Sequence, residues 1–114
     1  MVQEYLPNPL LIDGKKFDLR IYVMVTHLGS AAGAPLVAFI AEEGLVRLCT
    51  EDYSLPDKEN MGNLLSHLTN YSLNKNSENF KYTPDLELND GSKRTLSSVL
   101  KMLNLRDGIN VASL

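Results

Sequence analysis

The chain has 114 residues, an apolar share of 44% and a formal net charge of −3. This length allows at most one domain, and this composition is that of a folded chain and excludes a disordered tail. The basic residues form no block, which argues against a nucleic-acid partner, and no apolar run has the length of a membrane span. Cys49 is the only cysteine, which excludes an internal disulfide and favours a small buried side chain over a nucleophile.

The first quarter of the chain predicts strands. Val2 to Leu6 is strand-like, and because the sequence starts directly with it, no secretory signal is expected. The apolar run 10–12 is closed by Asp13-Gly14, a strong turn signal. A long strand is expected from 17 to 25, because apolar residues recur there at every second position and predict a core-facing side.

The next segments predict a hairpin. Residues 29–35 are small and read as a flexible connection, longer and richer in alanine than the usual turn, which suggests a local insertion. Residues 36–41 predict a strand, 42–44 a tight turn and 45–50 the partner strand. The sequence thus predicts a β-meander with the long strand in its middle.

The second half is mostly polar. Residues 54–60 and 74–89 lack periodicity, which indicates irregular loops, the second of them mobile. Apolar residues at helical spacing from Leu96 predict a helix, which either Ser92 or Thr95 could cap. The last six residues look like the start of another helix, and both ends of the chain look truncated.

The long strand carries three ionisable groups and a tyrosine on the side opposite to its apolar stripe. These are Lys16, Asp18, Arg20 and Tyr22. Side chains two apart on a strand point the same way. A cation, an anion and a cation in a row suit a nucleotide phosphate, and the alternative is a solvated face with weak surface ion pairs.

Arg47 is a second basic residue in a predicted strand. If strand 36–41 lies between the long strand and strand 45–50, Arg47 shares a face with Arg20 and Lys16. Converging cations repel one another unless an anion lies between them. The alternative is an ion pair of Arg47 with Glu42, Glu43 or Glu51, which are close in sequence.

A polar segment carries His67, Thr69 and Asn70, whose side chains can hydrogen-bond ribose or phosphate oxygens. The alternative is a turn or a helix cap, the commoner use of threonine and asparagine. The chain has neither a P-loop nor a Rossmann glycine motif, and no spacing typical of metal ligands.

A series of short blocks carries a more specific signal. The blocks are Gln3-Glu4-Tyr5-Leu6 with Pro9 to Gly14, then Lys16 to Val23, Glu43 to Arg47, Thr50 to Tyr53, His67 to Lys75, and Gly91 to Thr95. Together, in this order and over nearly the whole chain, they closely resemble the tubulin–tyrosine ligase-like family.

The resemblance implies an α+β chain with an ATP-grasp fold, here incomplete, with a central β-meander and a C-terminal helix. Residues 1–114 would be the central part of one such domain. It also implies ATP-dependent ligation of an amino acid to a glutamate side chain of a tubulin tail, through an acyl phosphate. Catalysis of such a reaction depends mostly on positioning the reactants and on stabilising the charge of the phosphates.

By position, the resemblance assigns Gln3, Glu4, Tyr5 and Leu6 to the backbone hinge beside adenine. Lys16, Asp18 and Arg20 would face the nucleotide and the acceptor, and Arg47 would stabilise the γ-phosphate. His67, Thr69 and Asn70 would complete the polar shell. Further phosphate-binding lysines are expected before residue 1. The Mg²⁺ ligands are expected after residue 114, so the isolated chain should be inactive.

The blocks look most like the polyglutamylase branch, which takes glutamate as co-substrate. A glycylase and a non-catalytic tubulin- or nucleotide-binding remnant are the alternatives, and a strict tyrosine ligase fits less well. The implied partners are tubulin tails and microtubules, with no nucleic acid and no membrane, and the implied state is a monomer. The implied location is the cytoplasm and cytoskeleton, extending to the cilium and basal body. The net charge does not suit acidic tails, whose docking surface would lie elsewhere.

Overall fold

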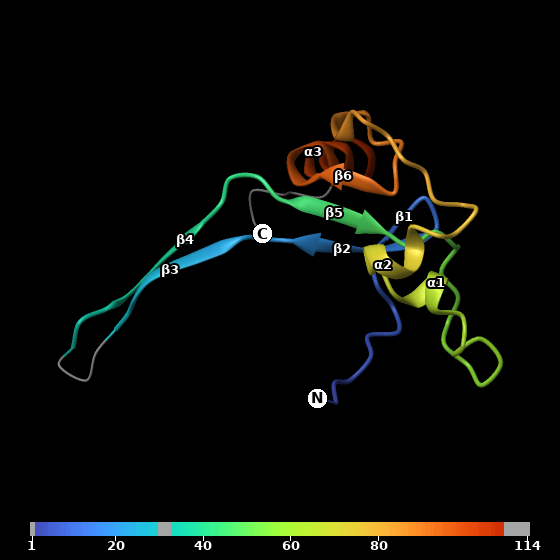
Figure 1. The fold of residues 1–114 in the computed structure, drawn as a ribbon, viewed down its shortest axis with the longest axis horizontal. Coiled ribbons are helices and arrows are strands. Elements are labelled where there is room, and N and C mark those ends of the chain that lie inside the picture. The colour runs from blue at the N-terminus through green and yellow to red at the C-terminus, as the bar shows by residue number, and fades with distance from the viewer. Residues whose placement is uncertain (1, 30–32, 109–114) are drawn as a thin grey trace.

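The computed structural model describes residues 2–29 and 33–108, which form two antiparallel sheets and three α-helices (Figure 1). The strands are β1 (Leu11–Ile12), β2 (Lys15–Arg20), β3 (Val23–Leu28), β4 (Leu36–Ile40), β5 (Leu45–Leu48) and β6 (Lys93–Thr95). The helices are α1 (Leu64–His67), α2 (Tyr71–Asn74) and α3 (Leu96–Asp107), with a 3₁₀ turn, η1, at Leu86–Leu88. This content agrees with the α+β prediction.

The four-stranded sheet has the order β1-β2-β5-β6. The predicted turn between β1 and β2 is confirmed: Asp13 and Gly14 have φ values of 52° and 75°, the left-handed backbone of a two-residue hairpin. The segment from Val2 to Leu6 forms no strand, so that prediction is wrong. Hydrogen bonds from Tyr5 and to the Pro7 carbonyl hold this part of the chain instead of a backbone ladder.

The predicted long strand is interrupted after Arg20. β2 pairs with β5, whereas β3 pairs with β4. The β2–β5 pairing ends at Arg20 with Leu45, and the β3–β4 pairing begins at Val23 with Ile40. Two residues lie between these pairs on one side and four on the other, and this unequal number interrupts the ladder of hydrogen bonds. The predicted hairpin between 36–41 and 45–50 is therefore wrong, as is a strict meander. Residues 42–44 instead form part of an irregular link between β4 and β5.

Gly44 ends that link, and the packing requires a glycine there. A Cβ atom at this position would lie only 2.6 Å from the carbonyl oxygen of Arg20. The Gly44 carbonyl in turn accepts from the amide of Leu96, the first residue of α3. The link thus joins the sheet to the start of the helix.

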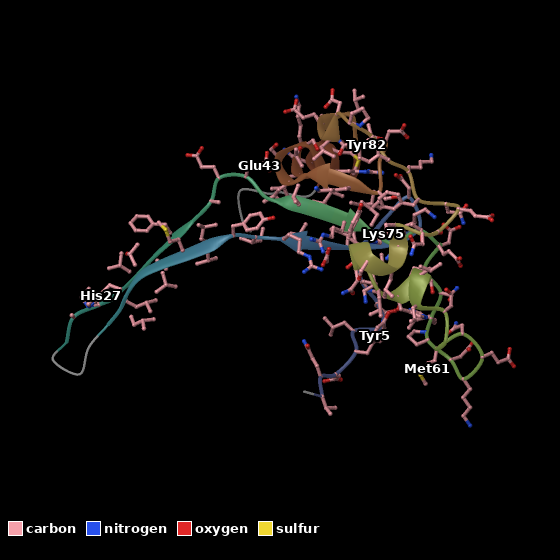
Figure 2. All side chains as sticks on the ribbon, in the orientation of Figure 1. Tyr5, His27, Glu43, Met61, Lys75 and Tyr82 are labelled. Atoms are coloured by element: carbon pink, nitrogen blue, oxygen red, sulfur yellow. The ribbon has the colours of Figure 1, made fainter. Side chains whose placement is uncertain are left out.

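The β3–β4 hairpin projects from the rest of the molecule (Figure 1). The radius of gyration is 17.0 Å, against about 13 Å for a compact domain of this length. Side chains leave both sides of the hairpin, with His27 near its far end (Figure 2). Val23 and Val25 are exposed, so the prediction that the whole apolar stripe faces a core is wrong here. The predicted connection 29–35 lies partly outside the described residues.

The core lies between the four-stranded sheet and α3. Its buried residues are Ile12, Val46, Leu48, Val99 and Leu103, with Phe17, Leu96 and Met102 packed against them. α3 confirms the predicted helix, and Thr95 rather than Ser92 caps it, accepting a hydrogen bond from the Ser98 amide. Residues 54–60 and 74–89 are largely irregular, as expected. The helix expected from residue 109 lies outside the described residues.

Cys49 is fully buried, which confirms the sequence interpretation. Burial raises the pKa of its thiol to about 11, mainly because the charged form loses water. We expect the thiol in the folded protein to react with a thiol reagent at least ~10-fold more slowly than in urea, because the thiolate is the reactive form. Absorbance at neutral pH would measure both rates, and equal rates would contradict the burial.

The Glu43 carboxylate accepts hydrogen bonds from the Ser97 hydroxyl at 2.6 Å and the Ser97 amide at 3.1 Å, at the first turn of α3. The Ser97 hydroxyl, then the Gly44 amide, hold the pKa of Glu43 below its usual value. A lowered folded pKa gives stability that is present above the ordinary pKa and lost as pH falls through the folded one.

We expect Glu43→Gln to lower the free energy of unfolding near neutral pH by less than about 1 kcal/mol, because the site is exposed to solvent. In acid the difference should vanish. Urea unfolding at both pH values measures it, and Glu42→Gln is the matched control. A loss of equal size in acid would contradict the assignment.

Candidate functional site

The pairing of β2 with β5 and of β5 with β6 builds one charged face. Asp18 lies opposite Arg47, and Arg47 lies opposite Lys93. Directly opposed residues share a face of the sheet, as do residues two apart on a strand. Lys16 and Arg20 therefore share this face too. The predicted grouping of Arg47 with Arg20 and Lys16 is confirmed, through direct pairing of β2 with β5 and not through residues 36–41.

Asp18 and Arg20 form an ion pair of 2.6 Å on this face, with side chains 31% and 38% exposed. The surface ion pair considered from the sequence is therefore present. However, Asp18 Oδ1 and Arg20 Nε are buried and have no hydrogen-bond partner among the described residues. One acceptor and one donor are thus left over, as in a site that a polar ligand completes.

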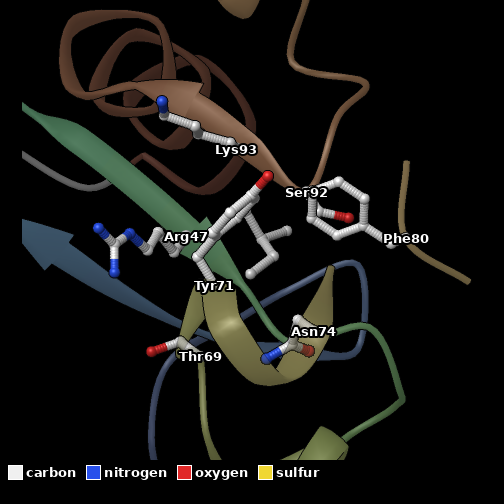
Figure 3. Close-up of a pocket in the computed structure, with 8 residues that line it drawn as sticks. Arg47, Thr69, Tyr71, Asn74, Phe80, Ser92 and Lys93 are labelled. Carbon is white, nitrogen blue, oxygen red and sulfur yellow. The ribbon is translucent and has the colours of Figure 1, made fainter. Parts of the chain in front are cut away.

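Arg47 does not make the ion pairs that its neighbours in sequence suggested. In the part of the chain that the structure describes, Glu43 binds Ser97, Glu51 accepts from Asn63, and no glutamate pairs with Arg47. Arg47 instead contributes to the lining of a small pocket between β5, β6 and α2 (Figure 3).

The pocket has a volume of about 160 Å³. It is lined by Arg47, Leu48, Thr69, Tyr71, Asn74, Phe80, Ser92 and Lys93. Its lining thus includes two basic residues, two residues with aliphatic hydroxyl groups and two aromatic rings in contact at 5.9 Å, and no acidic residue (Figure 3). Such a lining suits a small anion with polar groups.

The sequence interpretation proposed only Arg47 and Thr69 of this lining as site residues and missed the other six, namely Leu48, Tyr71, Asn74, Phe80, Ser92 and Lys93. The only feature of the sequence that pointed to Lys93 was its place in a polar stretch directly before the predicted helix. That stretch is a strand of three residues beside β5, too short for a period-two pattern. Phe80 stands in an irregular segment, where no local pattern predicts its neighbours.

Asn74 holds the wall of the pocket together. Its side chain is 1% exposed, and its oxygen accepts from both the amide and the hydroxyl of Thr50, each at 2.9 Å. Its amide nitrogen donates to the carbonyls of Leu68 and Asn70 at 2.7 and 3.0 Å. One side chain therefore joins the end of β5 to both short helices.

The remaining predicted site residues fall into two places. Gln3, Glu4, Tyr5 and Leu6 are exposed and line one groove together with Lys16. Thr69 is buried and lines the Arg47 pocket, whereas Asn70 is exposed at the start of α2 and is not part of its lining.

His67 lines neither place, but its buried ring lies next to the groove and is hydrogen-bonded to Tyr5 through Nδ1 at 3.1 Å. Among the described residues no cluster of three or more histidine, cysteine or acidic side chains could hold a metal ion. Neither does any described helix combine the length and apolarity that crossing a membrane requires.

A family model fits this arrangement of blocks. The model of the tubulin-tyrosine ligase family matches residues 1–113. The chain belongs to this family. The resemblance seen in the sequence is therefore confirmed.

Several members of the tubulin-tyrosine ligase family are similar to this chain. It is 45% identical over 111 residues to human tubulin polyglutamylase TTLL11, covering 97% of this chain and 14% of that protein. It is 48% identical over 99 residues to tubulin polyglutamylase ttll6 of Danio rerio, covering 87% and 12%. A probable beta-tubulin polyglutamylase of Tetrahymena thermophila is 45% identical over 104 residues, covering 90% and 8%. The chain thus spans a small part of each relative.

Asn74→Ala should destabilise the protein by about 2–4 kcal/mol, because it leaves the amide and hydroxyl of Thr50 and two backbone carbonyls without their hydrogen-bond partner. Asn76→Ala, at an exposed asparagine nearby, is the control and should change stability by less than about 0.5 kcal/mol. Denaturant unfolding measures both, and similar losses for the two variants would contradict the role given to Asn74.

Proposed function

We propose that this protein is an ATP-dependent ligase that adds glutamate to glutamate side chains of tubulin tails. The relatives named tubulin polyglutamylases support this, at 45–48% identity. In this proposal the chain is the central part of an ATP-grasp domain. Because the chain spans at most 14% of these relatives, the activity belongs to the longer protein that contains it.

The observation that carries the proposal is the pocket beside the charged face. Arg47 and Lys93 line it from neighbouring strands, and none of its lining residues is acidic. Free glutamate brings two carboxylates, which two cations can bind, whereas glycine brings one. Thr69 and Ser92 add hydroxyl groups that can accept from its ammonium group. This balance of charges favours glutamate over glycine as the co-substrate.

The proposed reaction has two steps. An oxygen of the tubulin glutamate carboxylate attacks the γ-phosphorus of ATP, the bond to the bridging oxygen breaks, and ADP leaves with that electron pair. The product is an acyl phosphate. The amine of free glutamate then attacks its carbonyl carbon, inorganic phosphate leaves, and the nitrogen loses a proton to give an amide.

The residues of this chain would position and neutralise the charges in these steps. Lys16 and Arg20 would face the phosphates, with Asp18 orienting Arg20 through their ion pair. Arg47 stands between this pair and the pocket, where the γ-phosphate and the acceptor carboxylate would meet. Since the described residues offer no metal cluster, no step is assigned to a metal held here.

Replacing the pocket cations should weaken glutamate binding in the intact protein. We expect Lys93→Ala to raise KM for glutamate by about 10–100-fold, because a charge-assisted hydrogen bond contributes about 1.5–3 kcal/mol. KM for ATP should change far less. Arg47→Ala should lower kcat as well, since Arg47 also faces the transferring phosphoryl group. Incorporation of labelled glutamate into tubulin measures these constants.

Lys101→Ala is the matched control, because this lysine is exposed on α3 away from the pocket. Unchanged KM for glutamate in Lys93→Ala and Arg47→Ala would overturn the assignment of the pocket. Incorporation of labelled glycine in place of glutamate would overturn the choice of co-substrate. Full activity of Arg20→Ala combined with Arg47→Ala would overturn the whole site.

A further inference from the structure

His67 has contacts that its expected place around the nucleotide does not explain. Its ring is only 7% exposed and lies edge-on to two tyrosines, with ring centroids at 5.9 Å from Tyr5 and 5.8 Å from Tyr53. Its Nδ1 atom is 3.1 Å from the Tyr5 hydroxyl. Its Nε2 atom is buried and has no partner among the described residues. This ring therefore lies inside an aromatic cluster.

The hydrogen bonds of this cluster connect Lys16, Tyr5 and His67 in series. The Lys16 ammonium can only donate, and it lies 3.4 Å from the Tyr5 hydroxyl oxygen. That oxygen has two acceptor lone pairs, so it can accept from Lys16 and still share a hydrogen bond with Nδ1 of His67. Either the hydroxyl hydrogen points to Nδ1 or the Nδ1 hydrogen points to the hydroxyl oxygen, and in both cases the bond orients the Tyr5 hydroxyl. We call this series of contacts, from Lys16 through Tyr5 to His67, the relay.

Lys16 is held on several sides by this relay. Its ammonium stands 4.4 Å above the centre of the Tyr5 ring, a cation–π contact, and donates to the backbone carbonyl of His67 at 3.1 Å. Tyr53 secures the chain beyond Tyr5, because its hydroxyl donates to the Pro7 carbonyl at 2.7 Å. The segment from Gln3 to Leu6 and the ammonium of Lys16 are thus fixed in one groove.

We propose that His67 is a positioning residue that does not touch the nucleotide. Through Nδ1 it orients the Tyr5 hydroxyl, and the oriented Tyr5 fixes the Lys16 ammonium and the 3–6 segment along the groove. This inference rests on the proposed function, since the ligand of the groove is ATP. The relay pre-organises the groove, so its loss weakens ATP binding and leaves the glutamate pocket intact.

Binding of ATP to the intact protein, measured by calorimetry, tests this directly. Tyr5→Phe keeps the ring and removes the hydroxyl, and we expect Kd for ATP to rise about 5-fold, as for one lost hydrogen bond. His67→Leu should give a similar rise. The double variant should be no worse than either single one, because both break the same relay. His67→Asn should restore most of the affinity, because its side-chain amide can either accept from or donate to the Tyr5 hydroxyl in place of Nδ1.

The control is Tyr82→Phe, which removes a hydroxyl from an exposed tyrosine and should leave Kd unchanged. Kd for glutamate and the unfolding midpoint of Tyr5→Phe should also stay unchanged, which a merely structural role would not predict. Additive losses in the double variant, or no rescue by His67→Asn, would overturn the relay. ATP binding without glutamate transfer by the wild type would overturn the proposed function alone, and no ATP binding would overturn both.

Discussion

The register of β2 against β5 is the constraint on which the site depends. Phe17 lies opposite Leu48, and Val46 and Leu48 belong to the core, so this side of the two strands must face α3 if the core is to be buried. Because strand side chains alternate, the same register sends Asp18 and Arg47 to the other face. A slip by one residue would bury the charges and expose the core. Burial of the apolar side thus brings the charged side chains together on the other face, although the cations among them repel one another.

The break after Arg20 divides the predicted long strand between two sheets. Up to Arg20 the chain belongs to the sheet that carries the core and the charged face, and beyond it the hairpin leaves that sheet. The four residues opposite the break include Glu43, which the irregular link places at the first turn of α3. The Gly44 carbonyl accepts from the same turn. The break therefore anchors the helix whose apolar side completes the core.

Local patterns predicted the parts of the fold that depend on neighbours in sequence. Asp13-Gly14 specifies its turn by backbone conformation alone, and the spacing from Leu96 specifies α3. Strand partners are set by contacts between distant segments, so the 36–41 and 45–50 pairing was wrong. The alternation of residues along the strand shows which side chains share a face, but not what covers that face. It therefore identified the charged side of β2, but it wrongly predicted that Val23 faces a core. The pocket needed Lys93 and Phe80, which only tertiary structure brings to Arg47.

The two sides of the sheet differ in what holds them. Behind it α3 packs through apolar side chains, whereas the buried residues around the charged face are mostly polar, among them Thr50, Thr69 and Asn74. The reason is that α1 and α2 are single turns of four residues, which leave most of their backbone groups unpaired and need side chains such as Asn74 to satisfy them. A hydrogen-bonded wall has directed dipoles that an apolar wall lacks. Around Lys16 this wall supplies the His67 carbonyl and the Tyr5 hydroxyl, which accept from its ammonium and hold that cation in place, so that binding of an anion there would require little reorganisation.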